Sequence, residues 1–258
     1  MRLPHPPPFF VKLFIVLFLI VVWQLLSWAG IWSPLLFPDP IRTVEYYLNN
    51  VSFVHSSVWM SLRILFTALF FSSLITLTFC SLAMISSRIR ILLETLLTLL
   101  APIPGTSLLP FAMLWFGLGS TPILFITVTG ALAVYMLPIM NGLSTISPIF
   151  LDVGKIYGFK TLKLIRYIYL PAALPSILTG MRSAWGLSWR SLISAELVFG
   201  MIGQGGGIGW IIALNRYHLN PDGMVVGLLS IIIVGFLIEN LVMGTIERRT
   251  VVRWGMKR

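Results

Sequence analysis

Two ionisable side chains stand inside a part of the chain that is otherwise apolar enough to cross a membrane. Arg190 lies near the middle of the apolar run 172–199, and Glu196 follows it by about one and a half helical turns. Because a charge is costly within a bilayer, such residues are functional candidates by default. Two interpretations stay open. Arg190 either attracts an anionic solute into a translocation path, or forms a buried structural pair with Glu196 or with Glu239.

The neighbours of Arg190 on a helix complete the candidate path. Ser194 lies one turn beyond Arg190 on the same face. Trp185 and Trp189 are close enough along the helix to line the same path. The predicted path residues are therefore Arg190, Trp185, Trp189, Ser194 and Glu196.

A short polar segment interrupts the apolar chain between residues 151 and 175. Its charged side chains are one acid and four bases, Asp152, Lys155, Lys160, Lys163 and Arg166. The apolar side chains available for burial are Ile156, Leu162, Ile165, Ile168 and Leu170. This mixture predicts a short amphipathic element that docks against a partner through its apolar residues. The alternative is an ordinary basic loop on the cytoplasmic side of a membrane.

Catalytic chemistry has little support in the sequence. The three histidines, His5, His55 and His218, are scattered and show no metal-ligand spacing. The eight carboxylates form no paired cluster along the chain. The glycine-rich run 203–209 lacks the Gly-Lys-Ser/Thr ending of a phosphate-binding loop, and an outer turn or re-entrant segment is expected there. No catalytic residue and no metal site are predicted.

The composition places these residues in a membrane protein. Hydrophobic residues make up 57% of the chain, charged residues 10%, and the mean hydropathy is +0.94. A soluble domain carries roughly 25% charged residues. The net charge of +10 does not indicate nucleic-acid binding, because the basic residues lie at the ends of apolar runs. The single cysteine, Cys80, allows no disulfide within the chain and is expected to be a packing residue.

Six apolar runs are long enough to be read as membrane spans, since a helix of about 20 residues crosses a bilayer. They cover residues 9–31, 58–85, 91–116, 122–143, 172–199 and 223–246. The third run is interrupted by Pro102, Pro104 and Gly105. A short amphipathic helix is expected at 40–48, where Pro40 occupies the first turn. The first run is longer than a signal-peptide core and is expected to remain as a helix.

The distribution of basic residues predicts the orientation. With six spans and a cytoplasmic amino terminus, the inner segments hold most lysines and arginines, while the outer ones hold only Arg42 and Arg216. This bias predicts that both termini are cytoplasmic. Residues 1–258 are expected to form one membrane domain with a core at 55–246, and the polar segment becomes an inner loop at 150–171 between spans four and five.

The polar segment resembles the conserved cytoplasmic loop of binding-protein-dependent ABC importer permeases. That loop reads Glu-Ala-Ala, three residues, Gly, nine residues, then Ile-x-Leu-Pro. Here Gly158 follows Asp152 by six positions, Ile168 comes ten later, and Leu170 and Pro171 close the run. Asp152, Val153 and Gly154 replace Glu-Ala-Ala, and the glycine is expected to weaken the first helix by up to about 1 kcal/mol relative to alanine.

Further segments, together covering about Leu36 to Arg253, look like the nitrate, taurine and alkanesulfonate branch of these permeases. They are Pro102 to Pro104, Leu114 to Gly119, Leu170 to Arg190, Ala195 to Leu197 and the glycines at 203–209. The resemblance implies an all-α permease fold in which two short helices of the inner loop, with a turn at Gly158, dock on an ATP-binding subunit. The coupling residues that it implies are Asp152, Gly154, Gly158, Lys160, Ile168, Leu170 and Pro171.

The resemblance also implies the partners and the reaction. Two copies of the chain would work with two ATP-binding cassette subunits and an extracytoplasmic solute-binding protein in a bacterial inner membrane. They would pass a small anionic solute, such as a sulfonate, taurine or nitrate, by alternating access. ATP and Mg²⁺ would be held by the partner ATPase, so no cofactor is expected in this chain. The alternative is a self-contained secondary transporter or channel that uses Arg190 and Glu196.

Overall fold

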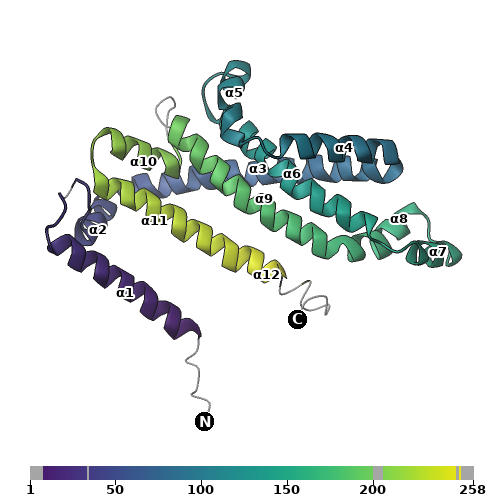
Figure 1. Cartoon of the computed structure of the whole chain (residues 1–258), viewed down its shortest axis with the longest axis horizontal. Helices are drawn as coiled ribbons and strands as arrows, with labels where there is room; N and C mark the ends of the chain where they lie inside the picture. The colour runs from purple at the N-terminus through teal and green to yellow at the C-terminus, as the bar shows by residue number, and fades with distance from the viewer. Residues whose placement is uncertain (1–7, 34, 200–205, 248–249, 251–258) are drawn as a thin grey trace, which may run out of the picture.

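A computed structural model describes residues 8–33, 35–199, 206–247 and 250 of the chain (Figure 1). In chain order the α-helices are α1 (Pro8–Trp28), α2 (Pro40–Asn49), α3 (Val51–Ile85), α4 (Ser87–Leu100), α5 (Leu109–Phe116), α6 (Ser120–Ser144), α7 (Pro148–Ile156), α8 (Thr161–Leu164), α9 (Leu170–Phe199), α10 (Ile208–Tyr217), α11 (Pro221–Leu237) and α12 (Gly244–Glu247). A 3₁₀ turn spans Gly105–Leu108, and π-helical turns span Ile165–Tyr169 and Ile238–Met243. The described residues contain no strand, which agrees with the predicted all-α membrane fold.

Four of the expected spans appear as helices long and apolar enough to cross a membrane. They are Val51–Ile85, Ser120–Ser144, Thr161–Val198 and Pro221–Ile246. The first begins seven residues earlier than expected, and the third includes part of the predicted inner loop. The expected first span is represented by the shorter apolar helix Phe14–Trp28. The described residues therefore hold four such helices, or five if the bent pair below counts as one span, where six were expected.

The third expected span is sharply bent. The helices Ser87–Leu100 and Gly105–Phe116 meet at 91° across a short break. Pro102 and Pro104 lie in this break, where neither can donate a backbone hydrogen bond to a continuing helix. The predicted interruption is thus confirmed, and Figure 1 shows α5 turned away from the paired helices α3 and α4.

Small side chains allow α3, α6 and α9 to pack closely and form the centre of the bundle. Ala68, Ser72, Ala131, Ala184 and Ser188 are buried on these three helices. Close packing through small residues is the usual means of association for helices in lipid. Cys80 is buried beside this centre with Tyr135 and Met136, in agreement with its expected packing role.

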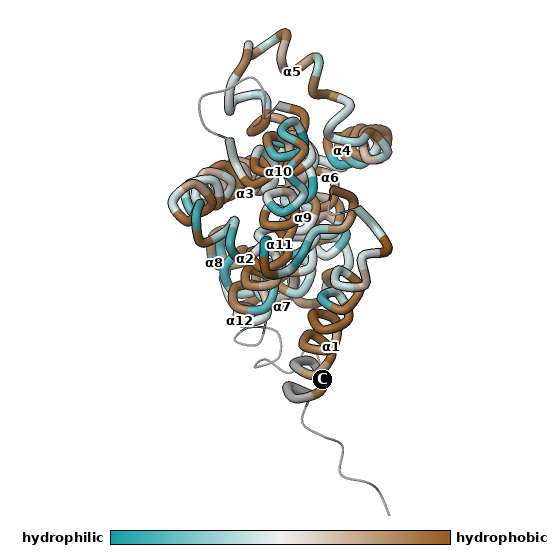
Figure 2. The backbone as a smooth tube through the Cα atoms, turned by 90° about the vertical axis from the view of Figure 1, so that its left-hand side faces the viewer, coloured by the Kyte–Doolittle hydropathy of each residue, from teal (hydrophilic) through white to brown (hydrophobic). Residues whose placement is uncertain are grey.

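The two ends of the bundle carry different elements. In Figure 1, α2 and α10 lie at one end, while α7, α8 and the turn between α3 and α4 lie at the other. The helix α2 matches the expected amphipathic helix, and its N-cap Asp39 accepts a hydrogen bond of 2.7 Å from the backbone N–H of Ile41. Trp23 of α1 donates to the carbonyl of Pro38 at 2.9 Å, and the rest of α1 extends away from the bundle as an apolar helix (Figure 2).

Candidate functional site

Residues 148–171, called the docking segment below, form two short helices joined by a tight turn. α7 ends at Ile156, α8 begins at Thr161, and the chain then continues through a π-helical turn directly into α9. Gly158 has a φ of +71°, a left-handed conformation that side chains disfavour. The turn is closed by a 2.9 Å hydrogen bond from the Gly158 N–H to the carbonyl of Lys155. The two helices and the glycine turn are as predicted from the sequence.

Gly154 serves a packing purpose that the sequence interpretation missed. It is buried in α7, and a Cβ there would lie 2.6 Å from Cδ1 of Ile168 and 2.7 Å from Cδ2 of Leu164. The glycine thus lets the helix after the turn fold back against α7. The expected loss of helix propensity remains, but it accompanies a close contact within the docking segment.

The docking segment presents apolar side chains outward. Ile156 is 83% exposed, Leu162 is 81% exposed, and Leu170 is also exposed. Ile168, in contrast, is half-buried against Gly154, so it supports the segment from inside. Pro171 is half-buried at the start of α9.

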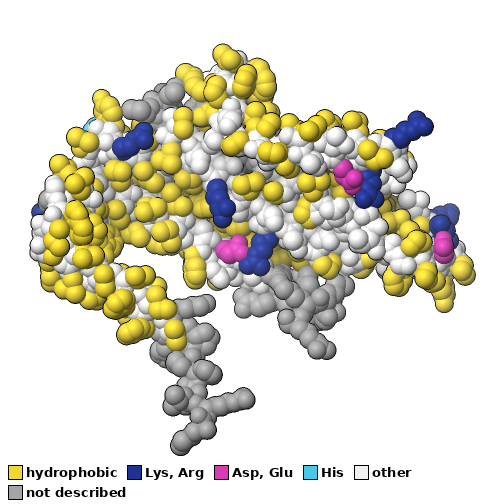
Figure 3. Space-filling view, viewed as in Figure 1, with side chains coloured by type: hydrophobic (Ala, Val, Ile, Leu, Met, Phe, Trp, Pro, Cys, Tyr) yellow, Lys and Arg dark blue, Asp and Glu magenta, His cyan; other side chains and the backbone are white. Residues whose placement is uncertain are grey.

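Charged groups border these apolar residues. Lys160 is exposed beside the turn, and the Lys155 ammonium lies 3.4 Å from a carboxylate oxygen of Asp152. Figure 3 shows cationic and anionic side chains over α7, at the end of a surface that is otherwise largely apolar. An exposed apolar patch with a charged rim is typical of a protein–protein contact.

The predicted path residues of α9 divide between two environments. Arg190 and Ser194 are exposed on one face of the helix. Trp185 and Trp189 are buried in the core, where their rings stack with centroids 5.7 Å apart. Trp185 is five residues from Arg190, which places it roughly 140° away around the helix. The two tryptophans therefore point into the core, away from the exposed face. The path role of Arg190, Ser194, Trp185 and Trp189 stays a prediction.

Thr179 and Ser183 extend the exposed face toward the docking segment. The side chains Thr179, Ser183, Arg190 and Ser194, called the polar stripe below, are all exposed and recur at helical spacing along α9. The sequence analysis placed Ser194 on the face of Arg190 but did not recognise Thr179 and Ser183, because hydroxyl side chains are common inside transmembrane helices. The signal that could have revealed it is their shared periodicity with Arg190.

Glu196 lies on another side of α9 and is only 2% exposed. The Ser61 hydroxyl of α3 lies 2.7 and 2.9 Å from its two carboxylate oxygens, and the Gly209 N–H donates to one of them at 2.9 Å. Ser61 also accepts a 2.8 Å hydrogen bond from the Ile208 N–H. The carboxylate therefore fastens the start of α10 to α3 and α9.

This arrangement corrects the expected ion pairs of Arg190. Glu196 is bonded to Ser61 and Gly209, while Glu239 accepts a 2.6 Å hydrogen bond from Nε of Arg182. Glu196 is six residues beyond Arg190, which places it roughly 120° away around the helix, so the two side chains diverge. The structure thus provides neither pair that the structural interpretation of Arg190 required.

Ser61 and the end of the glycine run were missed as partners of Glu196. A side chain on Gly207 would overlap the carboxylate and the Ser61 hydroxyl, so a glycine is needed there. Residues 203–205 of the predicted outer loop lie outside the described residues. The available signal was physical: a buried carboxylate needs donors, and glycines shortly after it offer backbone N–H groups without steric bulk.

The described part of the chain contains no candidate metal site. No group of three or more His, Cys, Asp or Glu side chains is close enough there to hold a metal ion. What the described residues can do is bind a partner at the docking segment and present a cationic, hydroxyl-bearing face on α9.

Comparison with known proteins adds an independent line of information. The family described as "Binding-protein-dependent transport system inner membrane component" matches residues 7–252. The taurine transport system permease protein TauC of Escherichia coli (strain K12) is 26% identical over 238 residues, which are 90% of this chain and 85% of that protein. The putative aliphatic sulfonates transport permease protein SsuC of Bacillus subtilis (strain 168) is 27% identical over 242 residues, which are 92% and 84% of the two chains. The protein of the same description from Escherichia coli (strain K12) is 31% identical over 163 residues, 63% of this chain and 60% of that protein.

Proposed function

The chain belongs to the family of binding-protein-dependent transport system inner membrane components, and from this membership we propose that it forms the translocation path of an ATP-driven importer for a small anionic solute. The membership confirms the resemblance drawn from the sequence. The solute class is supported by the relatives named for taurine and aliphatic sulfonates, both of which are anions or carry an anionic group. Arg190 on the exposed face of α9 supplies a matching charge.

The observation that carries the proposal is the docking segment. Its outward apolar side chains, Ile156 and Leu162, would remain in water unless a partner covered them. We assign that partner as an ATP-binding cassette subunit, one for each of two copies of this chain. The helix after the turn runs without interruption into α9, so movement of the partner would be passed to the helix that bears Arg190.

The polar stripe supports a path between two copies of the chain. A charged arginine near the centre of a span costs about 2.5–3.5 kcal/mol when it faces lipid. Arg190 with Ser183 and Ser194 therefore needs a neighbour other than hydrocarbon. A second copy facing this stripe would enclose an aqueous, positively charged path.

The remaining parts of the mechanism lie on other chains. A solute-binding protein would deliver the anion to the outer end, near α2 and α10, and ATP with Mg²⁺ would be held by the cassette subunits. The solute-binding protein and ATP drive alternating access only if each binds the inward-open and the outward-open state with different affinity. The bias of basic residues toward the docking segment and both termini supports a cytoplasmic position for them at an inner membrane.

The test is co-purification of the tagged chain from membranes in mild detergent. An ATP-binding subunit should accompany the native chain and be lost from Gly158→Val, because valine disfavours the positive φ of the turn. Gly117→Val is the matched control. Gly117 has a φ of +73°, and like Gly158 it has nothing within 4 Å of an added Cβ, but it lies between α5 and α6.

Three outcomes separate the alternatives. Loss of the ATP-binding subunit from Gly158→Val alone supports the importer. Equal loss from both variants would show that the docking segment is not the contact. A native chain that purifies alone and moves taurine into vesicles without ATP would establish a secondary transporter or channel and overturn the proposal.

A further inference from the structure

Two adjoining cavities lie between the docking segment and the inner half of the bundle. The larger has a volume of about 470 Å³ and the smaller about 230 Å³. Both are lined by Cys80, Met84, Ile85, Leu143 and Tyr169, so they adjoin each other, and together they are called the inner groove below. Its larger part falls within the range of about 300–1,000 Å³ that is usual for small-molecule sites.

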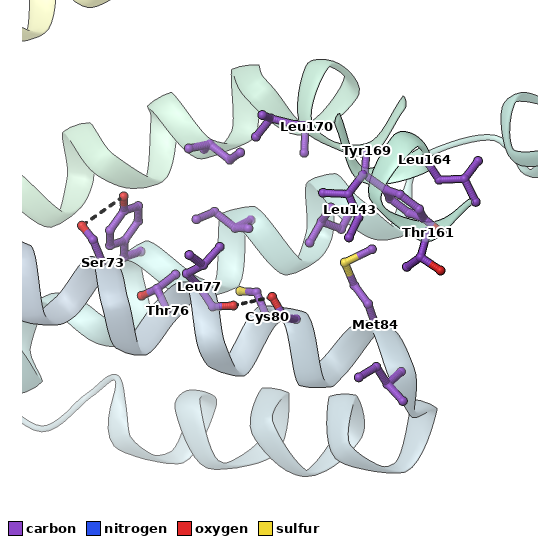
Figure 4. A pocket seen from close by; sticks show the side chains of 17 residues that line it. Ser73, Thr76, Leu77, Cys80, Met84, Leu143, Thr161, Leu164, Tyr169 and Leu170 are labelled. Atoms are coloured by element: carbon purple, nitrogen blue, oxygen red, sulfur yellow. Dashed lines mark hydrogen bonds between the residues drawn. The ribbon is translucent and has the colours of Figure 1, made fainter. Parts of the chain in front are cut away.

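The larger part of the inner groove is an apolar channel between α3 and the start of α9. Figure 4 shows Leu77 and Met84 of α3 opposite Leu170, with Leu143 of α6 in the same cavity. At its rim, Leu77 and Ile85 are exposed, so the channel opens at the surface of the bundle. A hydrocarbon chain could enter there from a surrounding bilayer.

The smaller part of the inner groove is polar. Ser87, Arg90, Ser144 and Tyr169 line it at the start of α4 and the end of α6. Arg90 donates from Nε to Glu94 at 2.8 Å, and about a third of its side chain is exposed. The guanidinium therefore keeps further N–H donors for an anionic oxygen.

Additional positive charge lies near the inner groove. Thr161 and Leu164 line the apolar part, and the exposed Lys160 and Lys163 are next to them in the chain. Arg88 is exposed in the first turn of α4. This combination of an apolar channel, a hydroxyl-bearing mouth and several cations matches an acyl chain that ends in an anionic head group.

We propose that the inner groove binds an anionic phospholipid of the cytoplasmic leaflet. One acyl chain lies between α3 and the start of α9, and the phosphate meets Arg90, Ser87 and Ser144. The placement in that leaflet rests on the proposed orientation of the docking segment. The site is separate from the polar stripe, because Ala173 and Ile177 line the groove roughly 100° or more around α9 from Arg190.

A lipid in the groove would also link the movement of the docking segment to that of α3. Thr161, Leu164 and Ile165 belong to the docking segment, while Leu77 and Met84 belong to α3. A lipid between them contacts both elements at once. Its occupancy therefore depends on the distance between the docking segment and α3.

The experiment measures lipid retained by the full-length chain, purified with its associated subunits from membranes that contain phosphatidylglycerol and phosphatidylethanolamine. Retained lipids are extracted and quantified per chain by mass spectrometry. Phosphatidylglycerol should be enriched over its share of the membrane. Ser81→Trp should reduce its retention severalfold, because Ser81 lines the apolar part and is exposed.

Each altered residue has a matched control. Thr78→Trp should retain lipid as the native chain does. Thr78 is also exposed on α3 and its hydroxyl, like that of Ser81, bonds a carbonyl four residues back, but it does not line the groove. Arg90→Gln should reduce phosphatidylglycerol by about tenfold through loss of a charge-assisted contact, whereas Arg63→Gln should leave it unchanged, because Arg63 is an exposed arginine on α3 that lines neither part of the groove.

The results are decisive in either direction. Equal retention by Ser81→Trp and Thr78→Trp, or retention of phosphatidylethanolamine as readily as phosphatidylglycerol, would overturn the proposal. A Ser81→Cys chain that cross-links to a second copy and retains no lipid would place a neighbouring helix in the groove instead. These readouts are independent of ATPase co-purification, so the failure of the proposed function and of this inference can be told apart.

Discussion

Replacing Ser61 with alanine should loosen the end of the bundle that holds α10, because one hydroxyl satisfies two buried groups there. Ser61 donates to the carboxylate of Glu196 and accepts the Ile208 N–H at 2.8 Å. In Ser61→Ala the carboxylate keeps the Gly209 N–H at 2.9 Å, but the Ile208 N–H loses its acceptor.

The magnitude follows from these two losses. A hydrogen bond to a charged group contributes about 1.5–3 kcal/mol, and an orphaned buried donor costs a further 1–3 kcal/mol or so. Bonds between transmembrane helices average only about 0.6 kcal/mol, since the reference state in lipid also finds partners. A net loss of about 2 kcal/mol lies between these limits. At about 2–4 °C per kcal/mol for a chain of this size, the melting temperature should fall by about 4–8 °C.

The matched control is Ser72→Ala. Ser72 is a fully buried serine on the same helix; its hydroxyl lies 2.8 Å from the carbonyl of Ala68 within α3 and has only a long contact, 3.4 Å, with the carbonyl of Val128 on α6. Thermal unfolding of the purified chain in detergent, followed by intrinsic fluorescence, should show a clearly larger shift for Ser61→Ala. A second measurement combines Ser61→Ala with Glu196→Gln. The two should couple by about 0.5–3 kcal/mol, as contacting residues do.

Two results would refute this reasoning. If the melting temperature of Ser61→Ala is no lower than that of Ser72→Ala, the hydrogen bond of Ser61 to Glu196 contributes no more to stability than the hydrogen bonds of Ser72. If the double variant shows the plain sum of the two single effects, Ser61 and Glu196 do not act as a pair.

Four further changes test other parts of the structure. Gly207→Ala should lower the melting temperature at least as much as Ser61→Ala, because the added Cβ overlaps the Glu196 carboxylate; an unchanged melting curve would contradict that contact. Arg190→Gln should leave the purified complex intact but reduce anion uptake in vesicles, and undiminished uptake would remove Arg190 from the path. Leu162→Asp should weaken binding of the ATP-binding subunit without changing thermal unfolding, since Leu162 is 81% exposed; a lower melting temperature would instead indicate a structural role. Glu239→Gln should lower the melting temperature, because Arg182 would lose the carboxylate that its Nε contacts at 2.6 Å within a span; an unchanged melting curve would contradict a stabilising role for this ion pair.

Local signals in the sequence predicted the elements that depend on neighbouring residues. Pro40 was expected in the first turn of α2, and the structure begins that helix at Pro40. The loop resemblance placed a turn at Gly158, where φ is +71°. Apolar length likewise located α6, and the span 221–246 that begins with α11, to within about two residues. Each of these features depends on residues that lie within a few positions of one another in the sequence.

Features set by distant contacts escaped prediction. Ser61 and Glu196 are 135 positions apart, and their hydrogen bond depends on how α3 and α9 pack. The pairing of Arg182 with Glu239 similarly joins residues 57 positions apart. The two prolines after α4 indicated a break, but the 91° bend depends on the packing of the helices on either side.

The uninterrupted passage from the docking segment into α9 has a mechanical consequence. Thr161–Val198 is one helical stretch of 38 residues, which at about 1.5 Å per residue forms a lever about 57 Å long. The Glu196 carboxylate anchors its far end to Ser61 on α3, while its near end emerges beside the glycine turn. α6 also packs against this helix around Gly180, so movement of the docking segment displaces the near end of the helix more than the part that α6 and α3 hold. Arg190 lies within this held part, so under the proposed function a large swing of the docking segment would displace it only slightly, and the arginine would keep its place beside the anion.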